Sequence, residues 1–185
     1  MNGEEIESLA MKHPEVSKHF IGVFSSNTLP EPASVGFYVA NLDPDTKEGT
    51  HWVAMDITKK KKKNIYFDSY GLPPCGDTFQ KCLGKNFIYN SKRLQHILST
   101  TCGQWCLYFL LRRAQKWDLD KIVKPFQDQG MDHCRSIVND HVLNYKVEQL
   151  FNTDLDVIDR AYATEQIIEI LRQINHADES SPGKK

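Results

Sequence analysis

The stretch Cys102-Gly103-Gln104-Trp105-Cys106-Leu107-Tyr108-Phe109-Leu110-Leu111 decides how this chain folds. In helical projection it is apolar on nearly all sides, and charged side chains follow only after Leu111. A helix that is apolar all round belongs in a protein core. We therefore predict a central helix from Cys102 to Trp117, with the rest of the domain built around it.

Short apolar runs before this helix predict strands. Val35–Leu42 has the continuous apolar character of a buried strand. His51–Ile57 and Asn64–Ser69 predict a hairpin, and the basic tip that joins them is Lys59-Lys60-Lys61-Lys62-Lys63. Phe87–Asn90 predicts a further short strand, so we expect a small mixed β-sheet.

Helical periodicity appears on both sides of these strands. Glu4–Lys12 has its apolar residues at helical spacing, and 132–151 and 156–174 predict two more amphipathic helices. The sequence contains no internal repeat and no evident linker. We expect a single α+β domain over residues 1–176, followed by a disordered tail over 177–185.

The composition is that of an ordinary globular protein. The chain has 185 residues, of which 40% are hydrophobic and 25% charged, and its net charge is −1. A charge near zero gives no general reason to expect a polyanionic partner, and no apolar run approaches the roughly 20 residues of a membrane span. The acidic start Met1–Glu7 is unlike a signal peptide. Five cysteines, none spaced Cys-x-x-Cys, favour free thiols in a reducing compartment.

His51, Asp68 and Cys102 supply the groups that a thiol hydrolase needs: a base, a carboxylate that orients it and a nucleophile. Cys102 stands where the central helix begins, and the free N–H groups and partial positive charge there favour a thiolate. The same N–H groups can hold an oxyanion. His51 and Asp68 belong to neighbouring strands of the hairpin, which would bring their Cα atoms within about 5 Å.

Other residues near these positions are candidates for binding. The side-chain amide of Gln95 could act as a second oxyanion donor. Gly103 would let a substrate carbonyl approach closely, whereas Trp52 could stack over the substrate or equally well pack in the core. The lysine run Lys59–Lys63 is most often a solvated hairpin tip, although such a run can also grip a phosphate backbone.

Less specific interpretations apply to several of these residues. Taken alone, Cys102 could be a small buried apolar residue, and we expect Cys106 to lie in the core. A zinc site formed by these two with His133-Cys134 matches no zinc spacing, so we expect no metal. We expect Asp56 to be an ordinary surface carboxylate.

Taken together, the segments resemble adenain, the adenovirus maturation protease, and more distantly the ubiquitin-like-protein proteases of the same clan. The resemblance rests on Phe20-Ile21-Gly22, His51-Trp52, Asp68, Gln95 and Cys102-Gly103, in this order along the chain. It covers residues 5 to 115 and implies a papain-like, adenain-like cysteine protease fold. Similar proteases are carried by virophages and by large virus-like transposons.

The resemblance also implies a function. His51 would be the base, Asp68 its orienter, Cys102 the nucleophile and Gln95 the oxyanion donor of a cysteine endopeptidase. Such an enzyme cleaves viral capsid and core precursor proteins during virion maturation, inside the virion and the host cell. Adenain uses an activating peptide and DNA as cofactors. Here Gly84 stands where adenain has the cysteine that binds the peptide, and the chain lacks adenain's strong basic charge.

Two other functions remain open at this point. Asp68 matches the ubiquitin-like-protein proteases, since adenain usually has Glu there, so the chain could be an isopeptidase that removes ubiquitin or a similar modifier. It could also be a catalytically silent module that binds nucleic acid or capsid protein through its lysine hairpin. We expect no membrane partner in any of these cases.

Overall fold

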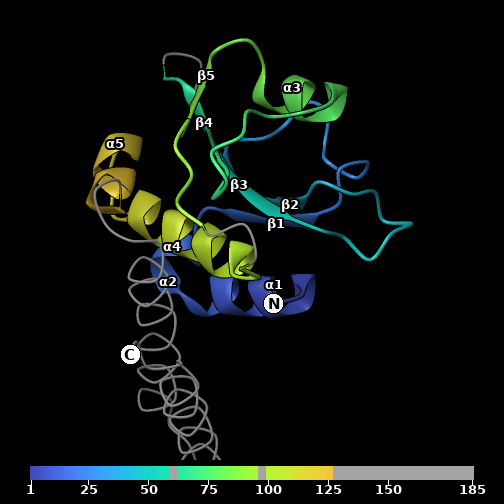
Figure 1. Cartoon of the computed structure of the whole chain (residues 1–185), viewed down its shortest axis with the longest axis horizontal. Helices are drawn as coiled ribbons and strands as arrows, with labels where there is room; N and C mark the ends of the chain where they lie inside the picture. Colours follow the sequence, from blue (N-terminus) through green and yellow to red (C-terminus); the bar gives the residue numbers. More distant parts are fainter. Residues whose placement is uncertain (59–61, 96–98, 127–185) are drawn as a thin grey trace, which may run out of the picture. The chain divides into compact units, whose positions relative to one another are not determined.

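A computed structural model of the chain describes residues 1–58, 62–95 and 99–126, all of which lie in one compact unit within Met1–Val142. This part of the chain is α+β, with a five-stranded mixed sheet and helices packed on it (Figure 1). The α+β class and the mixed sheet are therefore confirmed. The helices predicted over 132–151 and 156–174, the domain boundary at 176 and the tail lie outside the described residues.

The strands follow one another across the sheet in chain order. They are β1 (Phe20–Phe24), β2 (Gly36–Asn41), β3 (Trp52–Ile57), β4 (Asn64–Phe67) and β5 (Phe87–Tyr89). The three central strands are antiparallel, and each outer strand runs parallel to its neighbour. The predicted hairpin is thus confirmed as β3 and β4.

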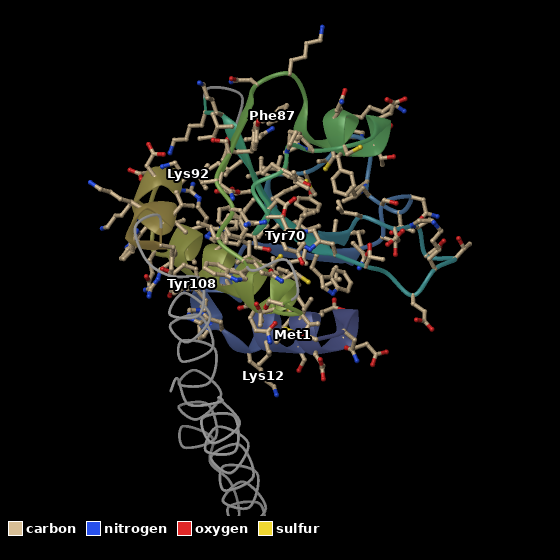
Figure 2. The ribbon with its side chains drawn as sticks, viewed as in Figure 1. Met1, Lys12, Tyr70, Phe87, Lys92 and Tyr108 are labelled. Carbon is tan, nitrogen blue, oxygen red and sulfur yellow. The ribbon has the colours of Figure 1, made fainter. Side chains whose placement is uncertain are left out.

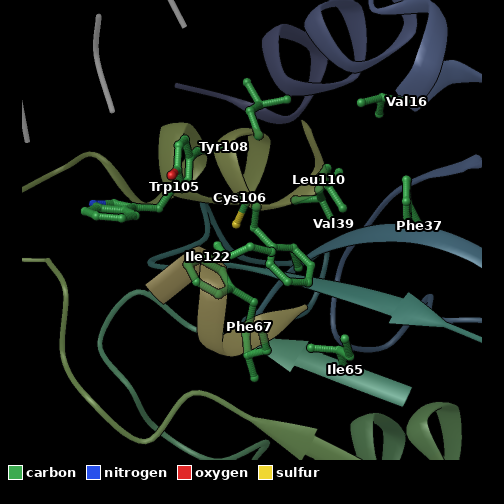
Figure 3. Packing of buried hydrophobic residues seen from close by; sticks show 14 of the residues in the cluster. Val16, Phe37, Val39, Ile65, Phe67, Trp105, Cys106, Tyr108, Leu110 and Ile122 are labelled. Carbon is green, nitrogen blue, oxygen red and sulfur yellow. The ribbon is translucent and has the colours of Figure 1, made fainter. Parts of the chain in front are cut away.

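The central helix α4 (Cys102–Ala114) packs on one face of this sheet. Because side chains alternate along a strand, Val39, Ala54 and Phe67 face α4, whereas Tyr38 and Met55 face away from it. The core under α4 is shown in Figure 3, where Cys106 lies among the apolar side chains, as predicted. The predicted core helix is therefore confirmed, although it ends at Ala114 rather than at Trp117.

Shorter helices complete the fold. They are α1 (Gly3–Lys12), α2 (Pro14–Ser17), α3 (Asp77–Leu83), α5 (Leu119–Val123) and a 3-10 turn (Lys124–Phe126). Helix α1 lies on the side of α4, and α3 covers the opposite face of the sheet, where Phe79 meets Tyr66 edge to face (Figure 1). The sequence analysis missed α2, α3 and α5, because helices of one or two turns are too short to show a periodic pattern.

The expectation that Asp56 is a surface carboxylate was wrong. Asp56 lies two residues after Ala54 in β3, so its side chain points to the same face of the sheet. It therefore faces α4 and is only 6% exposed. Nε and Nη2 of Arg113, at the end of α4, lie 2.8 and 2.7 Å from Asp56 Oδ2. A buried carboxylate requires such a partner, and this one lies 57 residues further along the chain.

Replacing Arg113 by methionine should destabilise the domain by about 2–3 kcal/mol, because it leaves the buried Asp56 carboxylate without its counter-charge. Urea unfolding followed by circular dichroism measures the loss. The double variant Asp56→Leu/Arg113→Met removes both charges and should recover much of it. If the single and double variants were equally stable, the ion pair would not be what holds α4 to β3 here.

Candidate active site

His51 and Asp68 meet at one end of the hairpin. Ala54 of β3 pairs with Phe67 of β4, so His51, directly before β3, and Asp68, directly after β4, lie beyond the last paired residues on the same side. Both side chains are buried, and His51 Nε2 lies 2.7 Å from Asp68 Oδ1. The two strands thus hold a hydrogen-bonded imidazole and carboxylate in one geometry.

Cys102 joins this pair as the first residue of α4. The half-buried Cys102 side chain interacts with the His51 side chain and with the backbone N–H groups of Trp52 and Gly103. Because Asp68 engages Nε2 of His51, Nδ1 is the ring nitrogen left to interact with Cys102; it is buried and has no hydrogen-bond partner among the described residues. The structure therefore brings the thiol, the imidazole and the carboxylate into one chain of contacts.

The surroundings shift both titrating groups toward their charged forms. Burial alone would lower the pKa of His51, but its hydrogen bonds to Asp68 and Cys102 and the charges of these groups outweigh burial and raise the pKa to about 9. Burial alone would raise the pKa of Cys102, but the hydrogen bonds from His51 and from two backbone N–H groups outweigh it and lower the pKa. Both shifts favour a thiolate–imidazolium pair.

Asn90 fixes the backbone of Asp68. It follows β5 directly, is buried, and bonds Asp68 in both directions: its Oδ1 accepts from Asp68 N at 3.0 Å, and its Nδ2 donates to Asp68 O at 2.6 Å. The backbone N–H of Tyr70 donates to Asp68 Oδ1 at 2.7 Å. Asn90 thus holds the backbone of Asp68, and Tyr70 N and His51 Nε2 both meet Oδ1 of its carboxylate. The sequence analysis missed Asn90, because a single Asn after a short strand carries no distinguishing local pattern.

Tyr70 is the second residue that the sequence analysis missed. Its ring stacks on the His51 imidazole with a centroid separation of 4.5 Å and an interplanar angle of 26°, and it lies near the centre of the view in Figure 2. Its hydroxyl lies 3.4 Å from the carbonyl oxygen of Ser99, in the segment that leads into α4. The aromatic ring therefore covers one face of the imidazole and limits its access to water.

Gln95 lies behind the site, fully inside the domain. Its Oε1 accepts from Ser69 Oγ and its Nε2 donates to Ser99 O, both at 2.7 Å. The amide thus ties the loop after β4 to the segment before Cys102. A role as oxyanion donor would need the second N–H of the same Nε2, and it stays a prediction.

Trp52 and Gly103 contact the start of the chain. Trp52 Nε1 lies 3.2 Å from the carbonyl oxygen of Met1, and the indole packs at the edge of the core, which is the alternative left open for it. A Cβ on Gly103 would lie 3.1 Å from Ile6 and 3.2 Å from Met1. Position 103 of the helix faces α1, so the absence of a side chain there lets α1 pack closely against α4. The expectation was that it would make room for a substrate carbonyl. Figure 2 shows Met1 at the start of α1.

Lys62 and Lys63 of the lysine run follow the end of β3 that lies away from His51. Lys62 and Lys63 are exposed, and Lys59, Lys60 and Lys61 lie outside the described residues. Within the described ranges, no group of His, Cys, Asp and Glu side chains is arranged to hold a metal ion. In the same ranges, no helix has the length and apolar character to cross a membrane.

Comparison with known proteins adds no family to this picture. The sequence matches no protein-family model, and a search of curated proteins finds no match. The function of the site therefore has to be argued from its own chemistry.

Proposed function

We propose that this chain is a cysteine-type endopeptidase in which Cys102 is the nucleophile, His51 the general base and Asp68 the group that orients it. One observation carries the proposal: the half-buried Cys102 thiol at the start of α4 interacts with the His51 side chain, whose Nε2 lies 2.7 Å from Asp68 Oδ1. This is the arrangement by which an orienting acid, a base and a nucleophile act as a unit. We propose the papain-like, adenain-like fold on the same order of residues.

In the proposed reaction, the Cys102 thiolate attacks the scissile carbonyl carbon, and an S–C bond forms while the carbonyl electron pair moves to the oxygen. Backbone N–H groups at the start of α4 stabilise this oxyanion. The His51 imidazolium protonates the departing amine as the C–N bond breaks. A water molecule then attacks the thioester with His51 as its base, which releases the acid and restores the thiolate.

The substrate class we propose is a viral capsid or core precursor protein. It rests on the resemblance of His51-Trp52, Asp68, Gln95 and Cys102-Gly103 to adenain. A ubiquitin-like isopeptidase is the second candidate, and the shorter acid at Asp68 favours it. Both activities use the same nucleophile. They differ in the substrate that the enzyme must bind before Cys102 reacts, a short peptide segment or a folded modifier.

Two electrophilic probes separate these candidates. One is a short peptide that ends in Gly-Gly with a vinyl methyl ester, and the other is ubiquitin or a related modifier with a C-terminal propargylamide. An endopeptidase should be labelled at Cys102 by the short peptide and should cut peptides internally. Labelling by the modifier alone would favour the isopeptidase, and labelling by neither would favour a silent binding module. Mass spectrometry of the peptide that contains Cys102 gives the readout.

Replacing Asp68 by asparagine should lower kcat of peptide cleavage by about two orders of magnitude or more, because Asn keeps the shape of the side chain but not its charge beside His51. The unfolding temperature should change little. Asp77→Asn, which alters an exposed aspartate at the start of α3, is the matched control and should cleave at the wild-type rate. Equal rates for the wild type and Asp68→Asn would remove Asp68 from the triad.

A further inference from the structure

A large cavity lies at the opposite end of β3 and α4 from the candidate active site. Its volume is about 980 Å³, which is within the range of ligand-binding pockets. Its lining includes Phe37, Ile57 and Ala114, so much of its wall is apolar. Since β3 and α4 both run from the site to this cavity, it lies roughly 17 Å from Cys102.

The charges around this cavity are predominantly positive. Asp56 is the one carboxylate in the described lining, and Arg113 already neutralises it. Lys62 and Lys116 also line the cavity, are exposed, and form no ion pair with any described residue. An apolar floor with two unpaired ammonium groups at the rim fits a ligand that is both apolar and anionic.

Lys116 occupies its place at a conformational cost. It follows the end of α4 with a φ of 64°, and the N–H groups of Lys116 and Trp117 donate to Arg113 O and Arg112 O. This is the helix ending in which glycine is strongly preferred at the left-handed residue. The backbone at this position favours glycine, and the lysine found there instead places an exposed ammonium group at the cavity.

We propose that this cavity is a docking site for a partner protein segment in which apolar side chains are flanked by aspartate or glutamate. The apolar side chains would fill the space over Phe37 and Ile57, and the flanking carboxylates would pair with Lys62 and Lys116. A nucleic acid would satisfy the lysines but would leave the apolar wall uncovered. The site is separate from the candidate active site, so the proposal does not depend on hydrolysis.

The test measures fluorescence anisotropy of a labelled peptide, Glu-Asp-Phe-Leu-Asp-Glu, on the full chain carrying Cys102→Ala, which prevents any cleavage of the probe. We expect saturable binding below about 1 mM that weakens with added salt. Replacing Phe-Leu by Ser-Ser in the peptide should abolish binding. No saturable binding, or equal binding of the Ser-Ser peptide, would overturn the proposal.

Lysine variants locate the site without disturbing the fold. Lys116→Gly removes the charge and places the preferred residue at the helix end, so the unfolding temperature should stay the same or rise. The double variant Lys62→Gln/Lys116→Gly should weaken peptide binding about tenfold. The matched control Lys85→Gln, at an exposed lysine outside the cavity, should leave peptide binding unchanged. Unchanged binding in the double variant would overturn the proposal. So would lysine-dependent binding of a single-stranded oligonucleotide without peptide binding.

Discussion

Cys102→Ala is expected to lower peptide cleavage by about 10⁴-fold or more, to the background of the assay, because it removes the atom that would form the acyl-enzyme. Cys102 is half-buried at the start of α4, and alanine is smaller and favours helix, so the fold should persist. Cleavage of a peptide with glycine at the scissile bond, followed by mass spectrometry, gives the rate. Circular dichroism of the same sample checks the fold.

Cys75→Ala is the matched control for this variant. Cys75 is exposed in the loop before α3, and its removal should change neither the rate nor the unfolding temperature. A Cys102→Ala protein that still cleaves the peptide would exclude Cys102 as nucleophile. Loss of cleavage in both variants would instead point to a general requirement for free thiols.

His51→Ala should remove the reactivity of the Cys102 thiol at slightly acid pH. In the wild type, the lowered pKa of Cys102 and the His51 pKa of about 9 leave a thiolate–imidazolium pair between these two values. Above pH 9 His51 loses its proton, and below the Cys102 pKa the thiolate is protonated. We expect alkylation by iodoacetamide to stay fast at pH 6.5, which is below the ordinary thiol pKa.

Without His51, the contributions of its side chain to the lowered pKa of Cys102 are lost, whereas burial still raises that pKa, so alkylation of Cys102 at pH 6.5 should slow by about tenfold or more. The two proteins should react at similar rates near pH 10. Peptide mapping after timed alkylation separates Cys102 from the exposed Cys75, whose rate should not depend on His51 and serves as the internal control. Equal rates for Cys102 with and without His51 at pH 6.5 would mean that no ion pair forms.

The local pattern of the sequence was sufficient to predict the elements that carry the site. Alternating and continuous apolar runs placed β2, β3 and β4 within a few residues, because burial on a sheet imposes its period on the sequence. The apolar run after Cys102 predicted α4. The position of Cys102 at the start of this run predicted that free backbone N–H groups of the first helical turn lie beside its thiol. Since His51 and Asp68 flank the two strands of one hairpin, their meeting also followed from local structure.

What the sequence did not reveal depends on contacts between distant segments. The side chain of Asp56 faces α4 because side chains alternate along β3. That its partner there is Arg113 follows only from how the helix lies across the sheet. Asn90 and Tyr70 hold the site from β5 and from the loop after β4, with no local pattern that marks them.

The sequence by itself thus determined the main strands, helices α1 and α4, and the candidate residues for chemistry, because burial and helix ends act over a few neighbouring residues. Only the tertiary structure decided that Gly103 admits Met1 and α1, and that Lys62 and Lys116 face one cavity. Such contacts depend on the packing of elements far apart in the chain, and close packing is specified by the three-dimensional fit of side chains rather than by any local period.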